Sequence, residues 1–100
     1  MSTASPRSRI LALLQTHKPR LIAEFGVREL ACFGSTVREE ADSESDIDIL
    51  VSFDGPATSA RYFGVQFYLE DLLGRPVDLV TDKALRAELR PLIEQEAVHV

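Results

Sequence analysis

The sequence predicts an α/β protein in which a small mixed β-sheet is backed by helices. Segments with apolar residues at helical spacing alternate along the chain with short β-prone segments, and Gly or Pro residues separate them. A length of 100 residues is typical of one domain, and an apolar content of 45% is sufficient for a packed core. We therefore expect residues 1–100 to form a single α/β domain.

Two helices are expected at the start of the chain. Ser5 and Pro6 are typical of an N-cap and the first helical position, and apolar residues at helical spacing continue to about His17. Pro19 favours the start of a second, short helix, because proline lacks the N–H group that a helix interior needs. Gly26 is a typical residue for the end of that helix.

Two strands are expected next. Residues 27–33 are mostly apolar and β-prone, whereas residues 46–53 alternate between apolar and polar types, which predicts a strand with one buried face. Between these strands, residues 36–41 are expected to form a short helical turn. The Asp-Gly-Pro sequence at 54–56 is a strong turn signal and ends the second strand.

The second half of the chain continues the alternation. A helix is expected from a cap at Thr58 or Ser59 to Leu73, and its apolar residues occupy more than one side. We hypothesise that part of this helix contacts another chain, with Tyr62 and Tyr68 as the residues to test. The remaining expected elements are a strand over 77–80, a helix over about 85–96 with a break at Pro91, and an edge strand over 97–100.

The net charge of −5 comes from one segment of the chain. Seven acidic residues and no Lys or Arg lie between Glu39 and Asp54, so the remaining residues carry a net charge of +2. Such an acidic protein is a poor candidate for nucleic-acid binding. The single cysteine excludes an intramolecular disulfide and a Cys-based zinc cluster. Because a membrane-spanning apolar run and a signal-like start are both missing, we expect a cytoplasmic protein with no membrane partner.

Three aspartates are expected on one face of the sheet. Asp46 and Asp48 lie two residues apart on a predicted strand, so their side chains point the same way. Asp78 is the polar residue of the predicted strand 77–80 and joins that face if the two strands pair. Carboxylates held so close repel one another, and the repulsion raises a pKa or attracts a cation. Oxygen ligands favour a hard ion such as Mg²⁺ or Mn²⁺, so we predict a site that can hold two metal ions.

Gly34 and Ser35 stand between a predicted strand and a predicted turn. Backbone N–H groups and the Ser35 hydroxyl can cradle a phosphate at such a position. The pair by itself usually marks only a turn, and it lacks the Lys-Ser/Thr of a Walker A loop. Its combination with Asp46-x-Asp48 and a third strand aspartate is far more specific.

This combination resembles the minimal nucleotidyltransferases (MNT) of the DNA polymerase beta superfamily, in particular those of the antitoxin type. The matching stretches are Phe33-Gly34-Ser35, residues 45–51, residues 74–81 and the closing residues 92–100. After Gly-Ser-x the family often has Ala-Arg-Gly, where this chain has Val37-Arg38-Glu39. The resemblance covers nearly the whole chain and implies a single minimal domain with the polymerase-beta-like nucleotidyltransferase fold.

By this resemblance, Gly34, Ser35 and Arg38 would bind the phosphates of a nucleoside triphosphate, with a surface ion pair as the alternative for Arg38. Asp46 and Asp48 would ligate two Mg²⁺ ions, and Asp78 would complete one metal site and help activate the attacking hydroxyl. The implied enzyme is a Mg²⁺-dependent nucleotidyltransferase that moves AMP from ATP to a hydroxyl and releases pyrophosphate.

The resemblance also implies a partner. Members of this size are typically paired with a HEPN-domain toxin, and the chain would be the antitoxin that adenylylates a tyrosine of that toxin. The alternative is a non-catalytic antitoxin that neutralises its toxin by binding alone. Transfer to a small-molecule hydroxyl is a weaker interpretation, because no second domain is present to build a substrate cleft. A homo-oligomer and a hetero-oligomer with the toxin both remain open.

Overall fold

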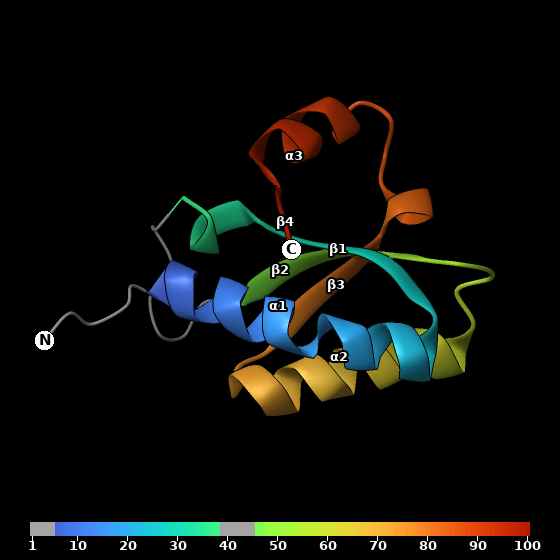
Figure 1. Cartoon of the computed structure of the whole chain (residues 1–100). Coiled ribbons are helices and arrows are strands. Elements are labelled where there is room, and N and C mark those ends of the chain that lie inside the picture. Colours follow the sequence, from blue (N-terminus) through green and yellow to red (C-terminus); the bar gives the residue numbers. More distant parts are fainter. Residues whose placement is uncertain (1–5, 39–45) are drawn as a thin grey trace, which may run out of the picture.

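The fold is described by a computed structural model for residues 6–38 and 46–100 (Figure 1). Within these residues, no helix combines the length and the apolar character needed to cross a membrane. The observed alternation of helices and strands confirms the predicted α/β class. In chain order, the elements are α1 (Pro6–Phe25), β1 (Val27–Phe33), the 3₁₀ turn η1 (Gly34–Thr36), β2 (Ile47–Phe53), α2 (Ser59–Leu73), β3 (Val77–Thr81), the 3₁₀ turn η2 (Asp82–Ala84), α3 (Arg90–Glu96) and β4 (Val98–His99).

One mixed sheet forms the centre of the fold, with the strand order β3-β2-β1-β4. β1 pairs antiparallel with both β2 and β4, whereas β2 and β3 are parallel and are connected through α2. A parallel pair needs such a crossover, because the chain must return to the same end of the sheet. Helices α1 and α2 cover one face of the sheet, and α3 lies on the other face (Figure 1).

The main core lies between the sheet and the layer formed by α1 and α2. The alternating apolar residues of β2 point into it, as the sequence predicts. The positions between them, 48, 50 and 52, therefore face the α3 side. There Leu50 packs in a second, smaller cluster with Ala31 and Leu85. The fully buried residues of the main core include Leu14, Leu21, Ile47, Ile49, Val51, Val65 and Leu69.

The first helix differs from the prediction. Instead of ending near His17, α1 continues to Phe25 with Pro19 in its interior. Pro19 cannot donate the backbone hydrogen bond to residue 15 that a regular helix would contain. Leu14 and Leu21 are fully buried on either side of it, and this packing against the sheet outweighs the local preference of proline.

The last helix is shorter than predicted. The segment expected to be helical from residue 85 begins its helix only at Arg90, so Pro91 occupies the first turn, where its missing N–H costs nothing. η1 spans residues 34–36 rather than the expected turn over 36–41, of which residues 39–41 lie outside the described part of the chain, as does the expected cap at Ser5. β4 confirms the expected edge strand.

The two tyrosines of α2 are not the exposed residues of this helix. The Tyr62 hydroxyl donates to the Leu79 carbonyl at 2.6 Å, and the Tyr68 hydroxyl shares a 2.6 Å hydrogen bond with His17 Nδ1. Phe63 and Phe67 lie instead on the outer side, 48% and 64% exposed, with their rings stacked at a centroid distance of 6.2 Å. The tyrosine hydroxyls are therefore used inside the molecule, Phe63 and Phe67 form the exposed aromatic surface of α2, and the contact of this helix with another chain stays a prediction.

Candidate functional site

Asp48 and Asp78 lie side by side on adjacent parallel strands. Each is the second residue of its strand, and the register of β2 and β3 places Asp48 directly opposite Asp78. Neighbouring strands are about 4.8 Å apart, so carboxylates at paired positions on one face are forced close together. Both aspartates point away from the main core, because their neighbours in sequence are buried in it: Ile47, Ile49, Val77 and Leu79.

Gly34 brings the backbone of η1 against the Asp48 carboxylate. Phe33 is paired with Asp48 across β1 and β2, so Gly34 begins η1 immediately beside this side chain. Gly34 has a φ of +78°, in the left-handed region that favours glycine. A Cβ at this position would collide with Asp48 Oδ2. Two independent constraints, the backbone conformation and the contact, therefore require glycine here.

The Asp48 carboxyl has a raised pKa. Burial is the largest cause, followed by the negative charge of Asp78 and a side-chain hydrogen bond with it, and then by the charge of Asp46. Together these raise the pKa of Asp48 from 3.8 to about 6, against the opposing positive charge of Arg38. The carboxylates of this face therefore hold unfavourable negative charge, which is the property of a site that attracts a cation.

The donor atoms suit Mg²⁺, although they do not form a closed cluster. Asp46 directly precedes β2 and is exposed, yet its charge acts on Asp48. Across residues 6–38 and 46–100, no group of three or more His, Cys, Asp or Glu side chains is arranged to hold a metal ion. The purely carboxylate donors of Asp46, Asp48 and Asp78 fit a hard divalent ion in their chemistry, and their role as ligands stays a prediction.

Ser35 and Arg38 lie at and just after η1. Ser35 is half-buried beside Gly34. Arg38 Nη1 forms an ion pair with Glu96 Oε1 of α3 at 2.5 Å, so the surface ion pair considered from the sequence is present. Its positive charge also lowers the pKa of Asp48. Arg38 is therefore near enough to the carboxylates to meet an anionic ligand there.

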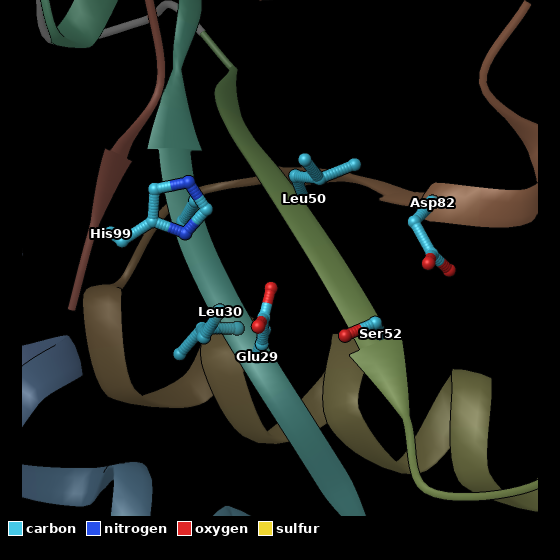
Figure 2. A pocket seen from close by; sticks show the side chains of 7 residues that line it. Glu29, Leu30, Leu50, Ser52, Asp82 and His99 are labelled. Carbon is cyan, nitrogen blue, oxygen red and sulfur yellow. The ribbon is translucent and has the colours of Figure 1, made fainter. Parts of the chain in front are cut away.

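A small hollow lies farther along the outer face of the sheet. Leu50 and Ser52, which follow Asp48 at alternate positions of β2, both line it. Its volume of about 30 Å³ is suitable for a water molecule and too small for a nucleotide. None of the predicted site residues belongs to it. Figure 2 shows the side chains that border it, among them Glu29, Leu30, Leu50, Ser52, Asp82 and His99.

Several residues around the site were missed by the sequence reasoning. Thr36 is 3% exposed, and its Oγ1 has no hydrogen-bond partner among the described residues. Glu96 reaches the site region from α3, which no local pattern indicates. A set of three α2 side chains that bind the backbone of β3 was also missed. Its sequence signal is a spacing of four residues on one helix face. This set consists of Tyr62, Gln66 and Glu70.

Comparison with known proteins identifies the family. The chain matches the nucleotidyltransferase domain family over residues 14–99, a span that contains every predicted site residue. The protein adenylyltransferase MntA of Thermococcus cleftensis is 42% identical over 91 residues, which cover 91% of this chain and 92% of that protein.

Solved structures agree with this match. A minimal nucleotidyltransferase with 34% identity superposes with a TM-score of 0.75, and the superposition covers 98% of each chain. A chain from the complex of a tri-AMPylated HEPN toxin with its MNT antitoxin, from Shewanella oneidensis, has a TM-score of 0.57 at 21% identity, covers 94% of this chain and 67% of that one, and shows the fold alone. The family match, the 42% identical relative and the shared fold together establish that this chain belongs to the nucleotidyltransferase domain family, as a minimal nucleotidyltransferase.

Proposed function

We propose that this chain is a Mg²⁺-dependent protein adenylyltransferase that transfers AMP from ATP to a tyrosine hydroxyl of a HEPN-domain toxin. In this proposal the chain is the antitoxin of a toxin–antitoxin pair. The observation that carries it is the direct opposition of Asp48 and Asp78 beside Gly34. Further support comes from the 42% identical relative, which is a protein adenylyltransferase, and from the AMPylated toxin bound to an antitoxin of the same fold.

Gly34 and Ser35 are proposed to bind the triphosphate. Because Gly34 has no side chain, its backbone already lies against the Asp48 carboxylate, and a phosphate can approach the loop equally closely. Backbone N–H groups of the loop and the Ser35 hydroxyl are the donors available for phosphate oxygens. Arg38 adds a positive charge near the same point, which favours an anionic ligand.

Asp46, Asp48 and Asp78 are proposed to hold Mg²⁺. When bound, Mg²⁺ would neutralise charge on the triphosphate and on the transferring phosphorus. The raised pKa of Asp48 supports this role, because a carboxylate that is costly to ionise alone gains most from a bound cation. Parallel strands of fixed register hold Asp48 and Asp78 in place before any ligand arrives, which reduces the reorganisation needed on binding.

The proposed reaction is a displacement at the α-phosphorus of ATP. The tyrosine oxygen forms a bond to this phosphorus, and the bond to the bridging oxygen of the β-phosphate breaks, so pyrophosphate leaves with that electron pair. The tyrosine proton must be removed as its oxygen attacks. Asp78, which is exposed, is the carboxylate best placed to receive it, whereas Asp48 is half-buried.

The deciding experiment uses ATP labelled at the α-phosphate, Mg²⁺ and the HEPN-domain toxin that we propose as the partner of this chain. We expect label on the toxin with the wild-type chain and none with Asp48→Asn. Glu24→Gln is the matched control, because it removes one carboxylate charge from an exposed position of α1 and should leave labelling unchanged. Tyrosine-to-phenylalanine variants of the toxin then identify the acceptor.

Each other outcome has a defined meaning. Neutralisation of the toxin without any label supports the alternative of an antitoxin that acts by binding alone. Mg²⁺ should also raise the melting temperature of the wild-type chain, since a ligand that binds only the folded state stabilises it. No Mg²⁺-dependent shift, with or without ATP, would contradict the metal site.

A further inference from the structure

β3 carries Asp78 at the edge of the sheet. Among residues 6–38 and 46–100, the strand order places β2 on one side of β3 and no strand on its other side. The outward backbone groups of such an edge strand lack ladder partners, although buried N–H and C=O groups need hydrogen bonds. How β3 is held on its outer side therefore bears directly on where Asp78 sits.

Three side chains of α2 bind that outer edge. The Tyr62 hydroxyl donates to the Leu79 carbonyl at 2.6 Å. Glu70 Oε2 accepts from the Val77 N–H at 3.0 Å, and Gln66 Nε2 donates more weakly to the Val77 carbonyl at 3.4 Å. The three residues are four apart, so they form one stripe along the helix. All three hydrogen bonds are partly buried, and they end on the two residues that flank Asp78.

We propose that Tyr62, Gln66 and Glu70 are positioning residues that fix Asp78 opposite Asp48. This inference rests on the proposed function and gives α2 a role in that function. The ladder with β2 holds the inner side of β3, and the stripe holds its outer side at the residues before and after the aspartate. Asp78 is thus held through its neighbours' backbone, while its own side chain stays exposed beside Asp48.

α2 also provides an internal comparison. The Tyr68 hydroxyl forms a hydrogen bond of the same length, 2.6 Å, and it too is partly buried, but its partner is His17 of α1. Tyr62 and Tyr68 therefore each contribute one hydroxyl hydrogen bond from the same helix. Only the bond of Tyr62 ends on the strand that carries Asp78. Tyr62→Phe and Tyr68→Phe remove the same chemical group and differ in which element is released.

The experiment compares these two variants in the chain of residues 1–100, together with the toxin proposed as its partner. With Tyr62→Phe, we expect kcat for transfer to fall roughly tenfold, because small displacements of a reacting group are costly. KM for ATP should change much less than kcat, because the Gly34–Ser35 loop is not on β3. With Tyr68→Phe, we expect kcat within about twofold of wild type. A second readout is Mn²⁺ binding to the chain without nucleotide, which Tyr62→Phe should weaken and Tyr68→Phe should not.

Glu70 provides the rescue test. Glu70→Gln retains an oxygen that can accept from the Val77 N–H, so it should transfer AMP almost as fast as wild type. Glu70→Ala removes the acceptor and should lower kcat as Tyr62→Phe does. Circular dichroism and melting temperature identify any variant that fails to fold, and Tyr62→Phe, which keeps the ring, then remains the decisive variant.

Failure of the positioning role and failure of the proposed function give different results. If the wild-type chain labels its toxin and Tyr62→Phe and Tyr68→Phe have equal kcat and equal Mn²⁺ affinity, the positioning role is overturned and the proposed function stands. If the wild-type chain neither transfers AMP nor binds Mn²⁺, the proposed function is overturned and the positioning role falls with it.

Discussion

Gly34 and Gly74 both have left-handed backbones, with φ of +78° and +67°, but only Gly34 has a carboxylate at the place of the missing Cβ. A Cβ at Gly74 would meet no atom within 4 Å. We expect Gly34→Ala and Gly74→Ala each to lose about 1–2 kcal/mol of stability from the backbone conformation alone. Only Gly34→Ala should also lose AMP transfer, by roughly 100-fold, because it displaces Asp48. Urea unfolding and the labelling assay measure the two effects, and equal activity in both variants would contradict the role of Gly34.

The raised pKa of Asp48 leads to a second prediction about a single residue. Its pKa is about 6 in the folded chain against an ordinary 3.8, so the folded state binds the proton more tightly than the unfolded state. Without metal, the contribution of Asp48 to stability should therefore increase as the pH falls through 6 and be complete below about 3.8. We expect a higher melting temperature at pH 5 than at pH 7 in EDTA.

Asp48→Asn tests whether the raised pKa of Asp48 causes this pH dependence of the melting temperature. It should raise the melting temperature at pH 7 and reduce the difference between pH 5 and pH 7, whereas Asp71→Asn should do neither. If wild type and Asp48→Asn had the same pH dependence, the raised pKa would have no part in stability.

At the level of the helices, we expect opposite effects on stability from replacing one proline in α1 and one in α3. Pro19 lies in the interior of α1, where it removes a backbone hydrogen bond, whereas Pro91 lies in the first turn of α3, where no such bond exists. Pro19→Ala should therefore stabilise the fold by about 1–3 kcal/mol. Pro91→Ala should change stability little or lower it slightly, through the greater freedom of the unfolded chain. Thermal unfolding checks both, and equal shifts would show that α1 is not strained at Pro19.

At the scale of the whole molecule, the outer side of α2 is the surface that the interaction hypothesis now concerns. Phe63 and Phe67 are its exposed aromatic residues, and Ile22 of α1, 46% exposed, offers a control outside their stacked pair. If this surface contacts another chain, Phe63→Ser with Phe67→Ser should weaken toxin binding or self-association at least roughly tenfold, and Ile22→Ser should not. Calorimetric titration and sedimentation measure these effects. A monomer that binds its toxin equally well with and without both rings would contradict the hypothesis.

How far the sequence predicts this molecule depends on whether a feature is local or long-range. The alternation in β2 predicts which of its residues point into the main core, because this signal lies within a few neighbouring residues. Asp46-x-Asp48 and Gly34-Ser35 are each local signals too, and together they predict the candidate site. The ion pair of Arg38 with Glu96 joins segments far apart in the chain, and no periodicity encodes it. The continuation of α1 through Pro19 likewise depends on packing against the sheet, which outweighs the local preference of one residue.

The mixed strand order also has a consequence for how the molecule folds. β1 and β2 are close in sequence and antiparallel, so Gly34 meets Asp48 in a hairpin that can form early. Asp78 reaches them only after the longer crossover through α2 closes, a step with a greater entropic cost. The repulsion between the two carboxylates then opposes only this late step. Divalent cations present during refolding would therefore act on the docking of α2 and β3, which is the step that completes the site.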